Sequence, residues 1–150
     1  MKILDLSLTY KWYDMIVSGE KKEEYREIKD YWIKRFIDIA AVKHEQDVRN
    51  SMHRLFREFT PAQVTYKDAL RYFPREHYDA VRFHRGQGGM QTMLIECKGI
   101  SVGYGNPEWG APADKEVFII KLGNRYITQI PTSDENKTTS PIAARSRKTL

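Results

Sequence analysis

The hydrophobic and polar positions at the start of the chain predict a strand followed by a helix. Residues 3–8, ILDLSL, place leucine at every second position, which is typical of a strand with one buried face. Thr9 can cap a helix over the next segment, in which Trp12 and Ile16 share a face, and Gly19 stands where a helix commonly ends. Residues 21–28 then alternate well enough for a second strand.

Helical periodicity dominates the middle of the chain. Residues 29–40 predict a helix or helical turn, and residues 45–58 carry the strongest helical signal in the sequence. In the second of these segments the apolar side chains recur at spacings of three and four, and they are Val48, Met52, Leu55, Phe56 and Phe59. A shorter helix over 66–73 is expected to begin after Thr65 as its cap and to stop at Pro74.

Beyond Pro74 the pattern changes to that of strands. Strand-like segments occupy residues 78–84, 91–105, 116–123 and 125–130. Gly86, Gly88 and Gly89 predict a tight turn after the first segment, and Gly123-Asn124 predicts a hairpin turn between the last two. This order of elements indicates an α+β fold: a small β-barrel of mixed or antiparallel strands with flanking helices.

Composition narrows the class of protein. A chain of 150 residues suits one domain with a hydrophobic core. Because 30% of the residues are charged and no run of 18 apolar residues occurs, we predict a soluble, cytoplasmic protein with no membrane partner. Cys97 has no second cysteine to pair with and is expected to be a small buried hydrophobe. Residues 131–150 are polar and predict a disordered tail.

Charge and histidine spacing bear on possible ligands. A net charge of +5 and a pI near 9.3 make nucleic acid a reasonable partner. The histidines follow no metal-ligand spacing, and they are His44, His53, His77 and His84. We therefore predict no metal site and no cofactor. No serine stands in a nucleophile elbow, and a mid-strand Cys97 is a poor nucleophile.

The charged segment 18–32, SGEKKEEYREIKDYW, has two interpretations. In the first it is a solvated surface. The positive charges of Lys21 and Lys22 then interact favourably with the negative end of the preceding helix dipole, and Glu24 forms a weak surface ion pair with Arg26. In the second it is a site, because Lys21 and Arg26 can hold phosphate or a carbonyl oxygen and Glu24 can accept from an amino group or take a proton. Composition and spacing alone favour the first interpretation.

A resemblance changes this weighting. Gly19, Lys21, Glu24 and Arg26 follow the predicted helix in the spacing G-x-K-x-x-E-x-R, which resembles the signature of the ASCH domain family. The segments GYGNPEWGAP and VFIIKLGNRY look like the closing part of such a domain. The resemblance covers residues 1–130, with 43–74 as a helical insertion that has no counterpart. It implies a PUA-like barrel with a cleft that suits RNA or a modified nucleotide.

From this resemblance we expect the protein to bind RNA or a modified nucleotide. The residues expected to contact the nucleic acid are Lys21, Lys22, Arg26, Arg82, Arg85, Tyr104 and Trp109. Tyr104 and Trp109 lie in a loop rich in glycine and proline, where a ring can stack on a base. Arg82 and Arg85 accompany the glycine-rich turn and can border the cleft.

Two other functions remain open. The first is a small hydrolase that acts on an acylated cytidine-like amide of a nucleoside or on RNA, in which Lys21 and Glu24 transfer protons and Arg26 stabilises negative charge. In family members that resemble acylated-cytidine amidohydrolases, a threonine takes the position that Glu24 has here, so the expected hydroxyl is missing. The second is a protein-interaction factor that contacts a partner through the helical insertion, in which Arg49, Arg54 and Arg57 are expected to be exposed.

Overall fold

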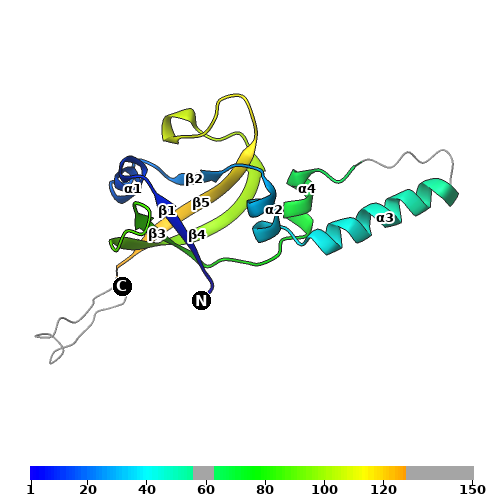
Figure 1. Ribbon diagram of the computed structural model, residues 1–150, viewed down its shortest axis with the longest axis horizontal. Coiled ribbons are helices and arrows are strands. Elements are labelled where there is room, and N and C mark those ends of the chain that lie inside the picture. Colours follow the sequence, from blue (N-terminus) through cyan, green and yellow to red (C-terminus); the bar gives the residue numbers. More distant parts are fainter. Residues whose placement is uncertain (56–62, 128–150) are drawn as a thin grey trace, which may run out of the picture.

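A curled five-stranded sheet forms the centre of the computed structural model, which describes residues 1–55 and 63–127 (Figure 1). Its strands are β1 (Ile3–Leu8), β2 (Glu23–Arg26), β3 (Ala80–Arg85), β4 (Thr92–Gly103) and β5 (Val117–Tyr126). They lie in the order β1-β3-β4-β5-β2, with β1 parallel to β3 and every other pair antiparallel. The α+β class is confirmed, and the sheet is a half-barrel whose edge strands are β1 and β2.

The helices of the described residues lie around this sheet. They are α1 (Tyr10–Val17), α2 (Asp30–Phe36), α3 (Ile39–Leu55) and α4 (Tyr66–Tyr72). In Figure 1, α1 lies beside β1 and β3, while α2, α3 and α4 gather at the other end of the molecule. Within the described ranges no helix is both long and apolar enough to cross a membrane.

The alternation in β1 produces the main core. Leu4, Leu6 and Leu8 are 5% exposed or less, while the polar residues between them face outward. Phe83 of β3 and Phe118 of β5 are fully buried in the same cluster. Phe36 at the end of α2 meets Phe118 edge to face at 5.1 Å, and such aromatic pairs add about 0.5–1.5 kcal/mol to area burial. The core therefore joins the sheet to α2 and fixes the end of β2 that leads into this helix.

The middle of the chain differs from the sequence prediction in its helix boundaries. The helix predicted over 29–40 ends at Phe36, because Ile37 is extended, almost fully buried, and forms a bridge with Pro74. Asp38 then accepts a hydrogen bond from the Ala41 amide at 3.1 Å. The next helix, α3, consequently begins at Ile39, earlier than predicted, while 56–58 lie outside the described residues.

The apolar stripe predicted for this long helix faces solvent in part. Val48, Met52 and Leu55 are 44%, 41% and 74% exposed, and α3 has no buried residue. Phe56 and Phe59 of the same stripe lie outside the described residues, as do Arg57 and the predicted tail 131–150. The cap of α4 is confirmed, since Thr65 Oγ1 accepts a hydrogen bond from the Asp68 amide at 3.1 Å.

One predicted turn is wrong and one is confirmed. Gly123 and Asn124 lie inside β5, which runs without a break from Val117 to Tyr126. A Cβ atom on Gly123 would lie 2.1 Å from Glu96 Oε1, so this glycine admits the Glu96 carboxylate, which also accepts from the Asn124 amide at 3.2 Å. The turn between β3 and β4 is confirmed, because Gly86 and Gly88 have φ values of 85° and 70°.

Candidate functional site

Lys21 is a buried lysine whose position follows from the end of α1. The Gly19 backbone has a φ of 85°, and the Lys21 amide donates to the Met15 carbonyl oxygen at 3.0 Å, so the chain turns back toward the sheet. The Lys21 side chain is only 1% exposed. Its Nζ donates to the carbonyl oxygen of Trp109 and lies 3.2 Å from Glu24 Oε1. Burial lowers the pKa of Lys21, while the Glu24 carboxylate acts in the opposite direction.

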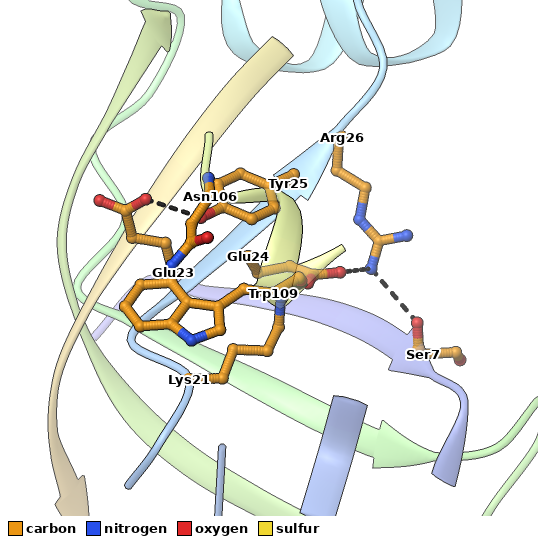
Figure 2. Close-up of polar contacts among 8 residues, drawn as sticks. All are labelled: Ser7, Lys21, Glu23, Glu24, Tyr25, Arg26, Asn106 and Trp109. Carbon is orange, nitrogen blue, oxygen red and sulfur yellow. Dashed lines mark hydrogen bonds and ion pairs between the residues drawn. The ribbon is translucent and has the colours of Figure 1, made fainter. Parts of the chain in front are cut away.

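Glu24 connects the two cations of the motif. It lies on β2 opposite Ile120 of β5, and its side chain is 8% exposed. One carboxylate oxygen pairs with Lys21, and the other lies 3.0 Å from Nη2 of Arg26 (Figure 2). The interpretation of this pair as a solvated surface contact is therefore wrong. Both oxygens are occupied by buried or half-buried cations, which offsets the cost of removing a carboxylate from water.

Arg26 bridges the two edge strands of the half-barrel. From β2, its Nη2 atom donates to the carbonyl oxygen of Ser7 on β1 at 3.2 Å (Figure 2). Its guanidinium carbon lies 5.3 Å from the centre of the Trp32 ring. The Nε atom is buried and has no hydrogen-bond partner in the part of the chain that the structure describes, although the side chain as a whole is 21% exposed. We call Lys21, Glu24, Arg26 and the Ser7 carbonyl group the Arg26 site.

The loop that carries Trp109 is fastened to this site at two points. Lys21 holds the Trp109 carbonyl group, and the Asn106 amide donates to the hydroxyl oxygen of Tyr25 at 3.0 Å. The Tyr25 hydroxyl in turn donates to Glu23 at 2.8 Å (Figure 2). Burial is the main cause that raises the pKa of Tyr25 to about 12. Residues 107–109 form a short 3-10 helix here, so the loop has a defined position over β2.

The other predicted contact residues do not share the contacts of this cluster within the described residues. Arg82 pairs with Asp5 at 3.2 Å, and Arg85 pairs with Asp14 at 3.0 Å. Lys22 is exposed beside Lys21, and Tyr104 is 66% exposed in the loop. The structure therefore brings together four predicted residues, which are Lys21, Glu24, Arg26 and Trp109. Their expected contacts with a nucleic acid remain predictions.

Two tryptophans and one backbone group belong to the site but were not predicted there. Helical spacing predicts a core position for Trp12 and Trp32, and both do pack against the core while half-buried. The centre of the Trp12 ring also lies 5.0 Å from Lys21 Nζ, and the centre of the Trp32 ring lies 5.3 Å from the Arg26 guanidinium carbon. Helical periodicity places these residues on a buried face but does not reveal what their ring faces touch. The Ser7 contribution is a carbonyl group, for which no sequence signal exists.

An open hollow lies next to the Arg26 site. It has a volume of about 610 Å³ and is lined by Ser7, Leu8, Thr9, Tyr10, Lys11, Gly86 and Gln87. Ser7 belongs to both, because its carbonyl oxygen accepts from Arg26 while the residue lines the hollow. The exposed Lys11 adds a cation there, and its ammonium lies 4.5 Å from the Trp12 ring. The hollow thus shares Ser7 with the Arg26 site and carries the positive charge of Lys11, while Arg26 itself does not line it.

Comparisons with protein-family models, with curated proteins and with solved structures each found no match. Over 1–55 and 63–127, no group of three or more His, Cys, Asp or Glu side chains is placed to hold a metal ion. The chemistry of the site therefore follows from its own contacts. Glu24 is saturated by two cations, and the donor atoms that remain belong to Arg26.

Proposed function

We propose that the protein binds RNA or a modified nucleotide at the Arg26 site. The observation that supports this proposal is the buried Nε atom of Arg26, which has no partner among residues 1–55 and 63–127 although a buried donor without one costs about 1–3 kcal/mol. A ligand oxygen or ring nitrogen would remove this cost. Nη2 already donates to Glu24 and Ser7, so the donor left for a ligand is Nε, and an arginine donor suits phosphate oxygens and the acceptor edge of a base.

The neighbouring groups favour a ligand that is both planar and negatively charged in part. Lys21, Glu24 and Arg26 together carry one excess positive charge, and Lys11 adds another at the hollow. Trp32 already supports one face of the guanidinium, so Arg26 is held in a fixed orientation. The resemblance of this motif to the ASCH family, and with it a PUA-like fold, supports the same proposal.

Binding accounts for the geometry better than hydrolysis does. A general acid or base must come within hydrogen-bond reach of its substrate. Lys21 is 1% exposed and its ammonium group is engaged by Glu24 and Trp109, and both oxygens of Glu24 are paired. In our proposal this pair therefore orients Arg26 and the loop, and Arg26 makes the contact with the ligand.

The proposal is tested by measuring the affinity for a short single-stranded RNA at 50 mM and 200 mM salt, concentrations over which phosphate contacts weaken strongly. We expect Arg26→Gln to weaken binding about tenfold or more, because hydrogen bonds to charged groups are worth about 1.5–3 kcal/mol. Lys98→Gln is the control, since Lys98 is exposed on β4 and the change removes one positive charge elsewhere. Arg26→Lys keeps the charge but loses the planar guanidinium and its Nε donor, and it should resemble Arg26→Gln.

Two results would contradict the proposal. One is the absence of RNA binding at 50 mM salt, and the other is an equal loss of affinity in Arg26→Gln and Lys98→Gln, which would reduce the interaction to net charge. Incubation with an acylated cytidine and with RNA, followed by chromatography, tests the alternative. Turnover that is abolished by Glu24→Gln would favour a hydrolase over a binding protein.

A further inference from the structure

Trp32 links the Arg26 site to two residues on the surface of α2. The Arg35 guanidinium carbon lies 5.9 Å from the Trp32 ring and 6.0 Å from the Tyr31 ring. Tyr31 and Trp32 meet edge to face at 4.7 Å. Together with the contact between Arg26 and Trp32, these distances describe a continuous series of cations and rings. We call Arg26, Trp32, Arg35 and Tyr31 the α2 row.

Tyr31 ends this row as an exposed but oriented aromatic ring. The side chain is 58% exposed, and its hydroxyl oxygen accepts a hydrogen bond from Arg35 Nη1 at 3.0 Å. A ring that is fixed by its own hydroxyl group loses little conformational freedom when a ligand packs on it. Tyr31 therefore has the properties of a stacking platform, with an open surface and a fixed direction.

Arg35 supplies positive charge to the same surface. Within residues 1–55 and 63–127 no carboxylate forms an ion pair with it, and its contacts are with Tyr31, Trp32 and the Tyr78 hydroxyl group. These hydrogen bonds raise the pKa of Arg35, although burial acts against them, so the group stays charged. Arg26, by contrast, shares the Glu24 carboxylate with Lys21. Arg35 therefore adds to the outer part of the row a positive charge that has no carboxylate partner among the described residues.

We infer that a single strand of RNA runs from the Arg26 site outward along α2, with a second base stacked on Tyr31 and a phosphate at Arg35. This inference rests on the proposed function and assigns an oligonucleotide, not a free nucleoside, as its ligand. The distances are suitable, because the ring contacts of 5.3 Å and 4.7 Å place Tyr31 within a few stacked-base steps of Arg26, each step being about 3.4 Å. Stacking of a base on an aromatic side chain contributes about 1–3 kcal/mol.

The test is a length series of RNA with the full chain. A ribonucleoside monophosphate, a dinucleotide and a tetranucleotide are titrated, and Kd is measured by calorimetry. We expect the tetranucleotide to bind at least about fivefold more tightly than the monophosphate, which is the lower end of one stacked base. Tyr31→Leu should abolish this gain, so that the tetranucleotide binds no more tightly than the monophosphate, whereas Tyr31→Phe, which keeps the ring, should preserve most of it.

Tyr72→Leu is the matched control. Tyr72 on α4 is 63% exposed and its ring lies 5.4 Å from Arg71, so it repeats the pairing of tyrosine and arginine outside the row. If Kd is independent of length, or if Tyr72→Leu removes the gain as Tyr31→Leu does, the α2 row is not a strand path although nucleotide binding stands. If neither the monophosphate nor the tetranucleotide binds, the proposed function itself fails. Tighter binding of a deoxyribotetranucleotide would overturn the assignment of RNA.

Discussion

Replacement of Lys21 by methionine tests whether the buried ammonium group organises the site. Methionine keeps a long unbranched side chain between the Trp12 and Tyr25 rings but removes the charge. The substitution deprives the Trp109 carbonyl group of its donor and leaves Glu24 with Arg26 as its remaining ion-pair partner. We expect the folded protein to become less stable and the Trp109 loop to lose one of its two attachments.

The magnitude follows from these contacts. Removal of one partner from a buried ion pair costs about 3–5 kcal/mol when the other charge is left alone. Here Arg26 still neutralises Glu24 at 3.0 Å, and the cost of burying the ammonium group, seen in the lowered pKa of Lys21, is relieved. We therefore expect a loss of about 2–3 kcal/mol in the free energy of unfolding. For a chain of this size that corresponds to a Tm lower by roughly 4–12 °C.

Urea unfolding followed by tryptophan fluorescence measures this loss, and Lys22→Met is the control. Lys22 is the adjacent residue and is exposed, so its replacement should change the unfolding free energy by less than about 0.5 kcal/mol. The double variant Lys21→Met with Glu24→Gln should be more stable than the sum of the single losses predicts, because the two groups interact directly. A Lys21→Met protein as stable as the wild type would refute the view that Lys21 holds the site together.

Two further predictions concern the loop around the site. Burial is the main cause that raises the pKa of Tyr25 from 10.0 to about 12, so the unfolded chain loses this proton at a lower pH than the folded protein does. The free energy of unfolding of the wild type should therefore fall as the pH rises from 10 toward 12. Urea unfolding at several pH values should show a shallower fall in Tyr25→Phe, and equal slopes would contradict the assignment. Gly105→Ala should cost about 1–3 kcal/mol, because its Cβ would lie 2.5 Å from the Tyr25 ring. In the control Gly103→Ala the nearest atom is 3.5 Å away, and an equally large loss of Tm there would show that the close approach at Gly105 is unimportant.

The sequence predicted those parts of the fold that depend on neighbouring residues in the chain. The leucines of β1, the cap of α4 and the glycine turn between β3 and β4 each have a short-range cause that the sequence contains. The spacing of Lys21, Glu24 and Arg26 likewise placed three side chains near one another. Their local order on β2 and at the end of α1 is sufficient for this, because all three lie within six residues.

The remaining features depend on contacts between distant segments. Gly123-Asn124 is a residue pair typical of turns, but Gly123 leaves space for the Glu96 side chain of the neighbouring strand. Ile37 interrupts a helical pattern because it is buried and bridges to Pro74. The environment of Arg26 is similar in kind, since Ser7 contributes through its backbone and Trp32 through a ring face. Such contacts are set by the curvature of the sheet and have no periodic signature in the chain.

The contact between Arg26 and Ser7 also affects how the molecule avoids aggregation. Among the described residues β1 pairs only with β3 and β2 only with β5, so each is an edge strand whose outer backbone groups can pair with a strand of another molecule. Arg26 occupies one such group, the Ser7 carbonyl, with a charged side chain. Loss of this arginine would therefore leave the Ser7 carbonyl group free to pair with a strand of another molecule, and it would also remove a ligand contact. Selection for solubility and selection for recognition would then act on the same guanidinium group.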